Sequence, residues 1–298
     1  MAGRTITLPF AVDLGLSLAP LRIGRHDPTM HLSASVVVRA SRTPEGPATV
    51  RAVHAGDVIE VDAWGDGAGW ALDHAPGLLG CLDDRAGFDP PEGIVRRLQR
   101  DSDGLRLPRT ERVVESLIPA VLSQKVTGFE ARRSYHQIVE RWGEPAPGPG
   151  GLLLQPLPEQ LAELGYYELH VVGMERKRAD TLKRVCAHAT RLEEAGTTTS
   201  TALRTRLETI PGVGPWTSAE VARQALGDPD AVSIGDFHLK NIVSGALAGE
   251  ARGSDARMLE LLEPYAGHRG RVCRLLEAAH AGAPRRGPRR PVEPLARH

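Results

Sequence analysis

Residues 207–219, which spell Leu-Glu-Thr-Ile-Pro-Gly-Val-Gly-Pro-Trp-Thr-Ser-Ala, constrain the fold of this 298-residue chain more than any other stretch. Apolar side chains recur at helical spacing up to Ile210, and the Pro-Gly pair that follows ends that helix. Pro215 then occupies the first position of the next helix, where its fixed backbone angle and missing N–H are best tolerated. The sequence therefore predicts a helix, a tight hairpin and a second helix, with the motif covering residues 203–226.

The predicted hairpin suits an anionic ligand. Gly212 and Gly214 flank one apolar residue, Val213, so the backbone can turn sharply and approach a ligand closely. The N-terminal end of the second helix adds a partial positive charge and unpaired N–H groups. We interpret the three hairpin amides as a phosphate-binding corner. The alternative is an ordinary connection between two helices, because short Gly-x-Gly turns also occur in proteins that bind no nucleic acid.

Asp236 follows about twenty residues after the hairpin, within Ile-Gly-Asp-Phe-His-Leu-Lys. Together, Leu-x-x-Ile-Pro-Gly-Val-Gly-Pro-Trp-Thr and Asp-Phe-x-Leu-Lys resemble the signature of the helix-hairpin-helix DNA glycosylase superfamily, and most closely its bacterial 3-methyladenine DNA glycosylase II branch. The resemblance extends to about Ala281 and is strongest over residues 203–243. It implies an α+β protein in which an N-terminal antiparallel β-sheet domain precedes an all-α glycosylase domain.

This resemblance implies a monofunctional DNA glycosylase that acts in base excision repair on double-stranded DNA containing damaged bases, with Asp236 as its catalytic residue. Hydrolysis of an N-glycosidic bond passes through a sugar with oxocarbenium character, which a neighbouring carboxylate stabilises. An alkylated purine such as 3-methyladenine or 7-methylguanine is already cationic and departs neutral, so a second acid is unnecessary. The alternative role for Asp236 is the N-cap of a helix predicted over residues 237–248, and the two roles are compatible.

Trp216 determines the expected subclass. The superfamily members that also cleave the DNA strand carry a lysine at this position, and its amine forms a Schiff base with the sugar. The indole of Trp216 cannot form one, and in this the chain resembles the monofunctional branch. The predicted base pocket therefore consists of Trp216, whose face can stack on a cationic base, and Glu220, one helical turn later. The alternatives are a buried core tryptophan and a solvent-exposed glutamate. Glu220 replaces an aromatic residue of the close branch, so the range of accepted bases stays open.

Further DNA contacts follow from the same resemblance. Residues 123–127 resemble the DNA-probing loop, with Gln124 as the probing residue and Lys125 at a wedge position where an apolar residue is expected. A solvated loop lysine is the alternative for Lys125. The predicted DNA-binding residues are Gln124, Lys125, Gly212, Val213, Gly214 and Thr217. The predicted metal ligands, for a monovalent cation present only with DNA, are the backbone carbonyls of Glu208, Ile210 and Val213. No other cofactor is expected.

Changes of pattern along the chain predict three segments. Residues 1–105 form the predicted N-terminal sheet domain, because β-branched runs alternate with Gly- and Pro-containing turns. The runs are residues 32–40, 48–54 and 58–64. Helical periodicity dominates residues 106–281, the predicted catalytic domain. Residues 282–298, rich in Arg, Pro and Gly, are predicted to be a basic disordered tail.

Composition does not decide the partner. The formal net charge is zero, which neither demands nor forbids a nucleic-acid partner, because a small DNA-repair enzyme can act through a local patch of charge. Three cysteines far apart in the sequence indicate neither a disulfide framework nor a zinc or iron–sulfur site. No apolar run is long enough to span a bilayer, so we expect a cytoplasmic protein without membrane contact. The resemblance implies a bacterial protein, and we expect it to be a monomer. The rival hypothesis is a helix-hairpin-helix DNA-binding protein with weak or lost catalysis.

Overall fold

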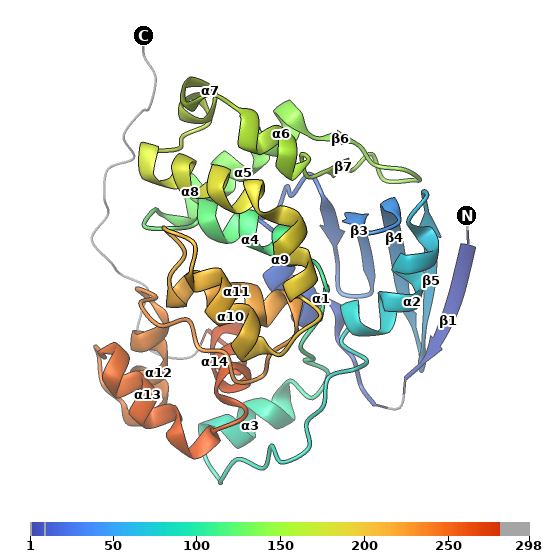
Figure 1. Ribbon diagram of the computed structural model, residues 1–298. Coiled ribbons are helices and arrows are strands. Elements are labelled where there is room, and N and C mark those ends of the chain that lie inside the picture. Colours follow the sequence, from blue (N-terminus) through green and yellow to red (C-terminus); the bar gives the residue numbers. More distant parts are fainter. Residues whose placement is uncertain (1, 9, 281–298) are drawn as a thin grey trace.

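The computed structural model describes residues 2–8 and 10–280 of the chain. The predicted basic tail over residues 282–298 therefore lies outside the described residues. A β-sheet stands at one side of a larger helical body (Figure 1), which confirms the predicted α+β class. Among the described residues, no helix combines the length and the apolar character needed to cross a bilayer.

The N-terminal sheet has five antiparallel strands in the order β1-β5-β4-β3-β2. The strands are β1 (Ala2–Thr7), β2 (Met30–Leu32), β3 (Val36–Thr43), β4 (Gly46–Ala55) and β5 (Val58–Trp64). Alternate side chains of β5 are buried, as expected for a sheet with one covered face. Strand β1 was not predicted, because Ile6 is its only buried residue and an exposed edge strand carries little hydrophobic pattern.

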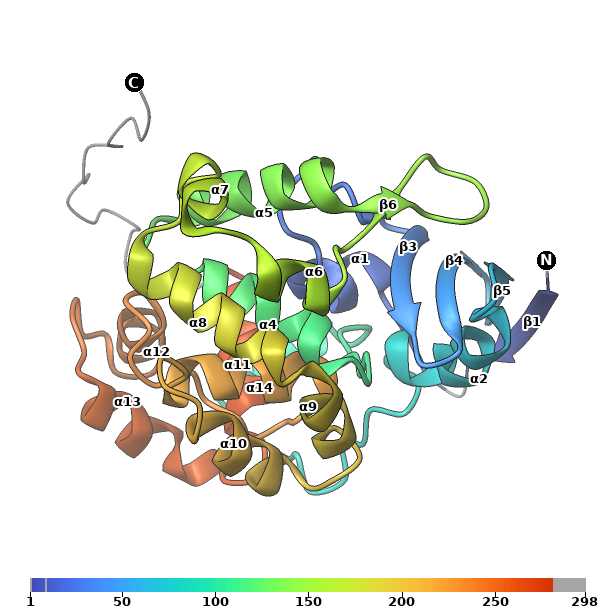
Figure 2. The ribbon, with the colours of Figure 1, turned by 45° about the horizontal axis from the view of Figure 1, so that its top comes forward.

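Two helices belong to the sheet region and were not predicted. Helix α1 (Leu14–Leu18) begins after Asp13, whose side chain accepts a hydrogen bond from the Leu16 amide. Helix α2 (Ala68–Leu78) packs on the sheet, as Figure 2 shows, and buries apolar residues against it. Helix α1 was therefore missed within the predicted sheet domain. The reason is that a one-turn helix closed by an aspartate cap is too short to show a helical period.

The helical body follows the predicted order with local differences. Its helices are α3 (Ile94–Asp101), α4 (Val113–Leu122), α5 (Gly128–Trp142), α6 (Pro158–Glu163), α7 (Tyr166–Val171), α8 (Arg176–Ala187), α9 (Ala189–Ala195), α10 (Ser200–Glu208), α11 (Pro215–Ala225), α12 (Leu239–Ala248), α13 (Asp255–Leu262) and α14 (Arg269–Ala278). A capping box opens α5, since Thr127 and Glu130 exchange hydrogen bonds there. The helical pattern before the hairpin is interrupted at His188, which divides α8 from α9.

Helix α4 lies at the centre of the helical body. Every residue of this helix is buried, because its sequence is apolar almost all round. The one carboxylate, Glu115, accepts hydrogen bonds from the Arg39 guanidinium at 2.8 Å, the Ser41 hydroxyl at 2.7 Å and the Arg42 amide at 2.9 Å. These three donors lie on β3, so Glu115 fastens the sheet to the helical core.

Helix α3 falls within the predicted sheet domain over residues 1–105, but it packs away from the sheet. Its buried residues Val95 and Leu98 share a hydrophobic cluster with residues of α12, α13 and α14. This cluster is separate from the one between the sheet and α2. The boundary placed at residue 105 stays a prediction, but the packing joins α3 to the C-terminal helices.

Candidate active site and nucleic-acid interface

The predicted helix-hairpin-helix motif consists of α10, a tight turn that includes Gly212, and α11. Proline stands in the first turn of α11, as predicted. Gly212 has a φ of 100°, and an added Cβ would overlap the Thr181 side chain of α8. Only glycine fits there, for conformational and steric reasons. The Val213 amide donates to the Ile210 carbonyl at 2.9 Å, so this amide is already used inside the turn.

Gly214 differs from Gly212 in both respects. Its φ of −116° is open to any residue, and an added Cβ would meet no atom within 4 Å. The Gly214 amide has no hydrogen-bond partner among the described residues, and the first N–H groups of α11 lack intrahelical acceptors. Unpaired amides, together with open space beside the Gly214 Cα, suit the close approach of a phosphate.

Asp236 lies just before α12 and is held by three N–H donors. Its Oδ1 accepts from the amides of His238 at 2.7 Å and Leu239 at 2.8 Å. Its Oδ2 accepts from the indole N–H of Trp216 at 3.0 Å. The helix predicted from residue 237 begins at Leu239, because the chain first turns around the Asp236 carboxylate. The N-cap residue of α12 is His238 and not Asp236, so the predicted N-cap position is wrong, although one oxygen of Asp236 accepts from two amides at the start of the helix.

Trp216 links the hairpin to this carboxylate. The indole is half-buried at the second position of α11, and its N–H points to Asp236 Oδ2. The prediction from sequence considered only the ring face, as a stacking surface or a core contact. The hydrogen bond adds a second role, since it fixes the carboxylate relative to the motif that presents the unpaired amides.

Gln124 ties the predicted probing loop to the hairpin. Its side-chain Nε2 donates to the Gly212 carbonyl at 2.9 Å and to the Thr217 hydroxyl at 2.9 Å. Thr217 is only 2% exposed, so its side chain serves this internal contact. The structure thus brings Gln124, Gly212 and Thr217 together, while their predicted contacts with DNA stay predictions.

Lys125 lies at the tip of the same loop. It is exposed and has a φ of 54°, which is uncommon for a residue with a side chain. The turn projects the lysine away from the packed helices and leaves the wedge assignment a prediction.

Glu220 is engaged in structural contacts. Its Oε1 accepts from the Arg223 guanidinium at 2.9 Å and from the Ser233 hydroxyl. Arg223 also pairs with Glu277 at 3.0 Å; burial lowers the pKa of Arg223, but the two flanking carboxylates raise it on balance. The negative charge of Glu220 is therefore balanced by Arg223, and its base-pocket role stays a prediction. The alternative of a solvent-facing glutamate is wrong for this carboxylate, because it lies between Arg223 and Ser233.

Ser233 and Arg223 were missed as site residues. Ser233 lies three residues before Asp236, so its bond to Glu220 holds the start of the loop that carries the carboxylate. The Glu220–Arg223 spacing of three residues on a helix was the one signal in the sequence that could have indicated their ion pair.

The predicted cation ligands are carbonyls of the turn. The Ile210 carbonyl accepts the Val213 amide and retains a second lone pair. The Glu208 and Val213 carbonyls accept no hydrogen bond outside regular helices among the described residues. Three carbonyl oxygens of one turn suit a weakly bound monovalent cation, and that site stays a prediction.

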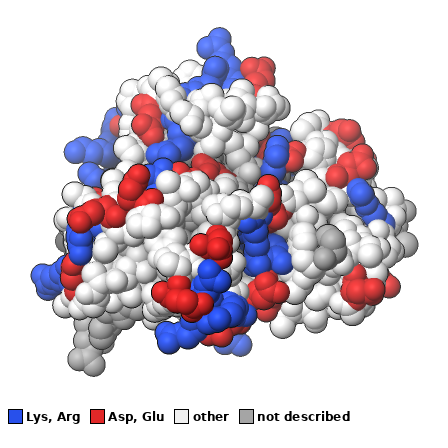
Figure 3. Space-filling model, turned by 90° about the horizontal axis from the view of Figure 1, so that it is seen from below, with Lys and Arg blue, Asp and Glu red and all other residues white. Residues whose placement is uncertain are grey.

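The described part of the chain contains no group of three or more His, Cys, Asp or Glu residues that could hold a metal ion. Burial raises the pKa of the Cys186 and Cys273 thiols to about 12, which keeps both protonated. Figure 3 shows acidic and basic side chains interspersed over one face of the molecule, in keeping with the zero net charge.

Comparison with known proteins places these features in a family context. A model of the HhH-GPD superfamily base excision DNA repair proteins matches residues 118–266. A probable bifunctional transcriptional activator/DNA repair enzyme AlkA of Mycobacterium tuberculosis is 34% identical over 161 residues, which cover 50% of this chain and 32% of that protein. DNA-3-methyladenine glycosylase 2 of Escherichia coli is 28% identical over 167 residues, covering 54% of this chain and 57% of that protein.

A similar fold occurs in a 3-methyladenine DNA glycosylase from Archaeoglobus fulgidus. The TM-score is 0.78 at 20% identity, over 93% of this chain and 98% of that one. The sequence match spans about a third of the Mycobacterium protein and just over half of the Escherichia coli one.

Proposed function

This chain belongs to the HhH-GPD superfamily of base excision DNA repair proteins, and from that premise we propose that it is a monofunctional DNA glycosylase that releases alkylated purines from duplex DNA. The observation that carries the proposal is the hydrogen bond from the Trp216 indole to Asp236 Oδ2, beside a hairpin with unpaired amides. A carboxylate, a flat ring and a phosphate-binding turn are the three components that base release from DNA needs.

The hairpin positions the DNA in this mechanism. The Gly214 amide and the first N–H groups of α11 bind a backbone phosphate, and the positive end of the helix strengthens that contact. The damaged nucleotide must leave the stack to expose its C1′ atom to a side chain. Phosphate contacts near the lesion therefore hold the strand while the nucleotide turns toward Asp236.

Asp236 performs the chemical step. The bond from C1′ to the base nitrogen breaks, and its electron pair neutralises the cationic purine as it departs. The carboxylate stabilises the positive charge that develops on the sugar, and then accepts the proton of the water that adds to C1′. Two backbone amides and the indole N–H hold both oxygens in place, so the charge is oriented before the reaction begins.

Trp216 supports the monofunctional assignment, because an indole nitrogen cannot form a Schiff base with the sugar. Borohydride reduction would trap such an intermediate as a covalent protein–DNA adduct. We expect no adduct with alkylated duplex DNA. A trapped adduct would show that a lysine elsewhere attacks the sugar and that strand cleavage accompanies base release.

The decisive test substitutes Asp236→Asn, which keeps the shape and the capping capacity but removes the charge. We expect duplex DNA carrying N3- or N7-methylpurines to bind with parental affinity, while release of free base slows by about 10²–10³-fold. Chromatographic measurement of released base under single-turnover conditions gives the rate. Glu250→Gln is the matched control, because it removes the same charge from a carboxylate that contacts Arg257 near the end of α12.

Parental base release by Asp236→Asn would reduce the aspartate to a helix cap and refute the mechanism. If the parent protein bound DNA but released no base from any alkylated duplex, the rival function, a DNA-binding protein that has lost catalysis, would be supported instead.

A further inference from the structure

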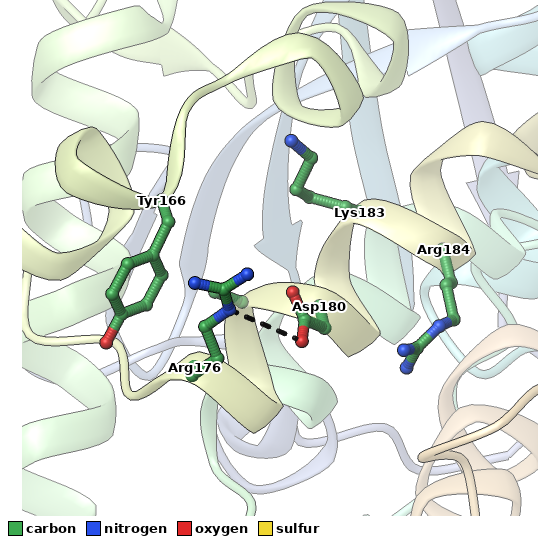
Figure 4. Close-up of a pocket in the computed structure, with 6 residues that line it drawn as sticks. Tyr166, Arg176, Asp180, Lys183 and Arg184 are labelled. Carbon is green, nitrogen blue, oxygen red and sulfur yellow. Dashed lines mark ion pairs between the residues drawn. The ribbon is translucent and has the colours of Figure 1, made fainter.

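A basic cleft lies on α7 and α8, apart from the Asp236 site. Its volume is about 360 Å³. Figure 4 shows the charged side chains of α8 and the Tyr166 ring around it. The lining residues are Tyr166, Arg176, Ala179, Asp180, Lys183 and Arg184. None of these residues belongs to the predicted DNA-binding set.

The cleft carries an excess of positive charge. Three of its side chains are cations, and Asp180 is the one carboxylate. Asp180 is 3.8 Å from the exposed Arg176, so this pair is loose and well solvated. Arg176 also lies over the Tyr166 ring at 5.0 Å, which keeps its guanidinium near the cleft.

The remaining two cations use only part of their donor capacity. Lys183 Nζ donates to the Leu164 carbonyl at 2.6 Å, and an ammonium has two further N–H groups. Arg184 donates through one nitrogen to the Pro211 carbonyl at 3.2 Å, and its other nitrogens have no partner among the described residues. The spare donors are suited to an anion with several acceptor oxygens.

One lining residue of the cleft, Arg184, contacts the hairpin directly. Arg184 bonds to Pro211, the residue before Gly212, and Gly212 lies against Thr181 one helical turn away on α8. A strand whose phosphate sits on the hairpin amides therefore has its neighbouring phosphates within reach of α8. Successive phosphates of one strand advance by only about 3.4 Å along the duplex axis.

We propose that this cleft binds backbone phosphate of the DNA strand that the hairpin holds, with Arg184 and Lys183 as the donors to phosphate and Arg176 as an outer cation. The inference rests on the proposed function only in taking duplex DNA as the ligand. The contact carries no sequence information, so it increases affinity and fixes the position of the strand.

The test measures binding of undamaged duplex DNA as a function of salt for the double variant Lys183→Gln/Arg184→Gln. If each side chain contacts one phosphate, the slope of log K against log[salt] becomes shallower by about 1.8, and affinity near physiological salt falls by roughly tenfold or more. Arg97→Gln/Arg100→Gln is the matched control: it removes two charges from α3, at the opposite end of the helical body in Figure 1, and we expect the parental slope.

Two further measurements make the result specific. Arg176→Gln removes an exposed cation that does not contact the hairpin, so a smaller loss in this variant cannot come from a disturbed turn. The duplex can also be shortened one base pair at a time from either end. We expect the difference in affinity between the parent and the double variant to disappear when one end is shortened, and to persist when the other is. Inorganic phosphate, which matches a single phosphate group, should compete with DNA only at concentrations far above those of the duplex.

Base release at saturating protein separates this inference from the proposed function. We expect the double variant to release base at the parental single-turnover rate. Parental affinity and slope in the folded double variant would refute the phosphate site while leaving the glycosylase proposal intact. Tight binding of free phosphate without any effect on DNA binding would also refute it, because the cleft would then be a small-anion site.

Discussion

At the scale of single residues, the bond between Trp216 and Asp236 is the contact on which the chemistry depends. The indole N–H holds one carboxylate oxygen, and we propose that the ring face stacks on the departing base. Trp216→Phe separates the two roles, because phenylalanine keeps an aromatic face and loses the donor. A hydrogen bond to a charged group contributes about 1.5–3 kcal/mol, so we expect the single-turnover rate to fall roughly 10- to 100-fold.

The comparison for this substitution is Trp142→Phe at the end of α5, which should leave the rate unchanged. A Trp216→Phe protein that kept the parental rate but bound damaged DNA more weakly would show that the ring only stacks on the base.

At the scale of elements, the two hairpin glycines serve different purposes. Gly212 is required by the fold, whereas a Cβ added at Gly214 would meet no atom within 4 Å. Gly214→Val should therefore fold normally, with a thermal midpoint close to that of the parent. It should bind duplex DNA about tenfold or more weakly, because the added methyl groups occupy the position of the phosphate. Fluorescence anisotropy with labelled duplex measures the loss.

Gly69→Ala in α2 is the control, because its added Cβ makes only an ordinary contact with Glu45. Gly212→Val is a poor test of binding, since positive φ and overlap with Thr181 destabilise the fold itself. Undiminished affinity in a folded Gly214→Val protein would exclude the hairpin as the phosphate site.

At the scale of the whole molecule, a buried ion pair joins the sheet side of the chain to its last described helix. Arg271 of α14 donates to both oxygens of Asp83 at 2.7 Å, and their side chains are 2% and 3% exposed. Asp83→Asn leaves a buried guanidinium without its counter-charge, which typically costs about 3–5 kcal/mol. We expect urea unfolding to show a decrease of that size.

The matched substitution is Asp89→Asn, whose carboxylate is 85% exposed and pairs with Arg96 on the surface. It should change the free energy of unfolding by less than about 1 kcal/mol. Equal effects of the two substitutions would mean that the buried pair does not stabilise the attachment of α14 to the sheet side of the chain.

Much of the fold could be predicted because it depends on local patterns. The runs that became β4 and β5, the hairpin between α10 and α11, and the capping box at Thr127 each have their signal within a few neighbouring residues. Asp236 and Trp216 were identified in the same way, from a motif of fixed spacing. Elements without a local pattern were missed, as β1 shows with its single buried residue.

The fold class, the hairpin and the candidate catalytic carboxylate could be inferred from local patterns and motifs of the chain. The contacts that these residues make depend on how the folded protein packs. Asp83 and Arg271 are 188 positions apart, and Gln124 lies 88 positions before the Gly212 carbonyl that it binds. Such pairs produce no periodic pattern in the sequence. Their partners meet only after segments distant in the chain have packed together, as α4 does with α8 and α11.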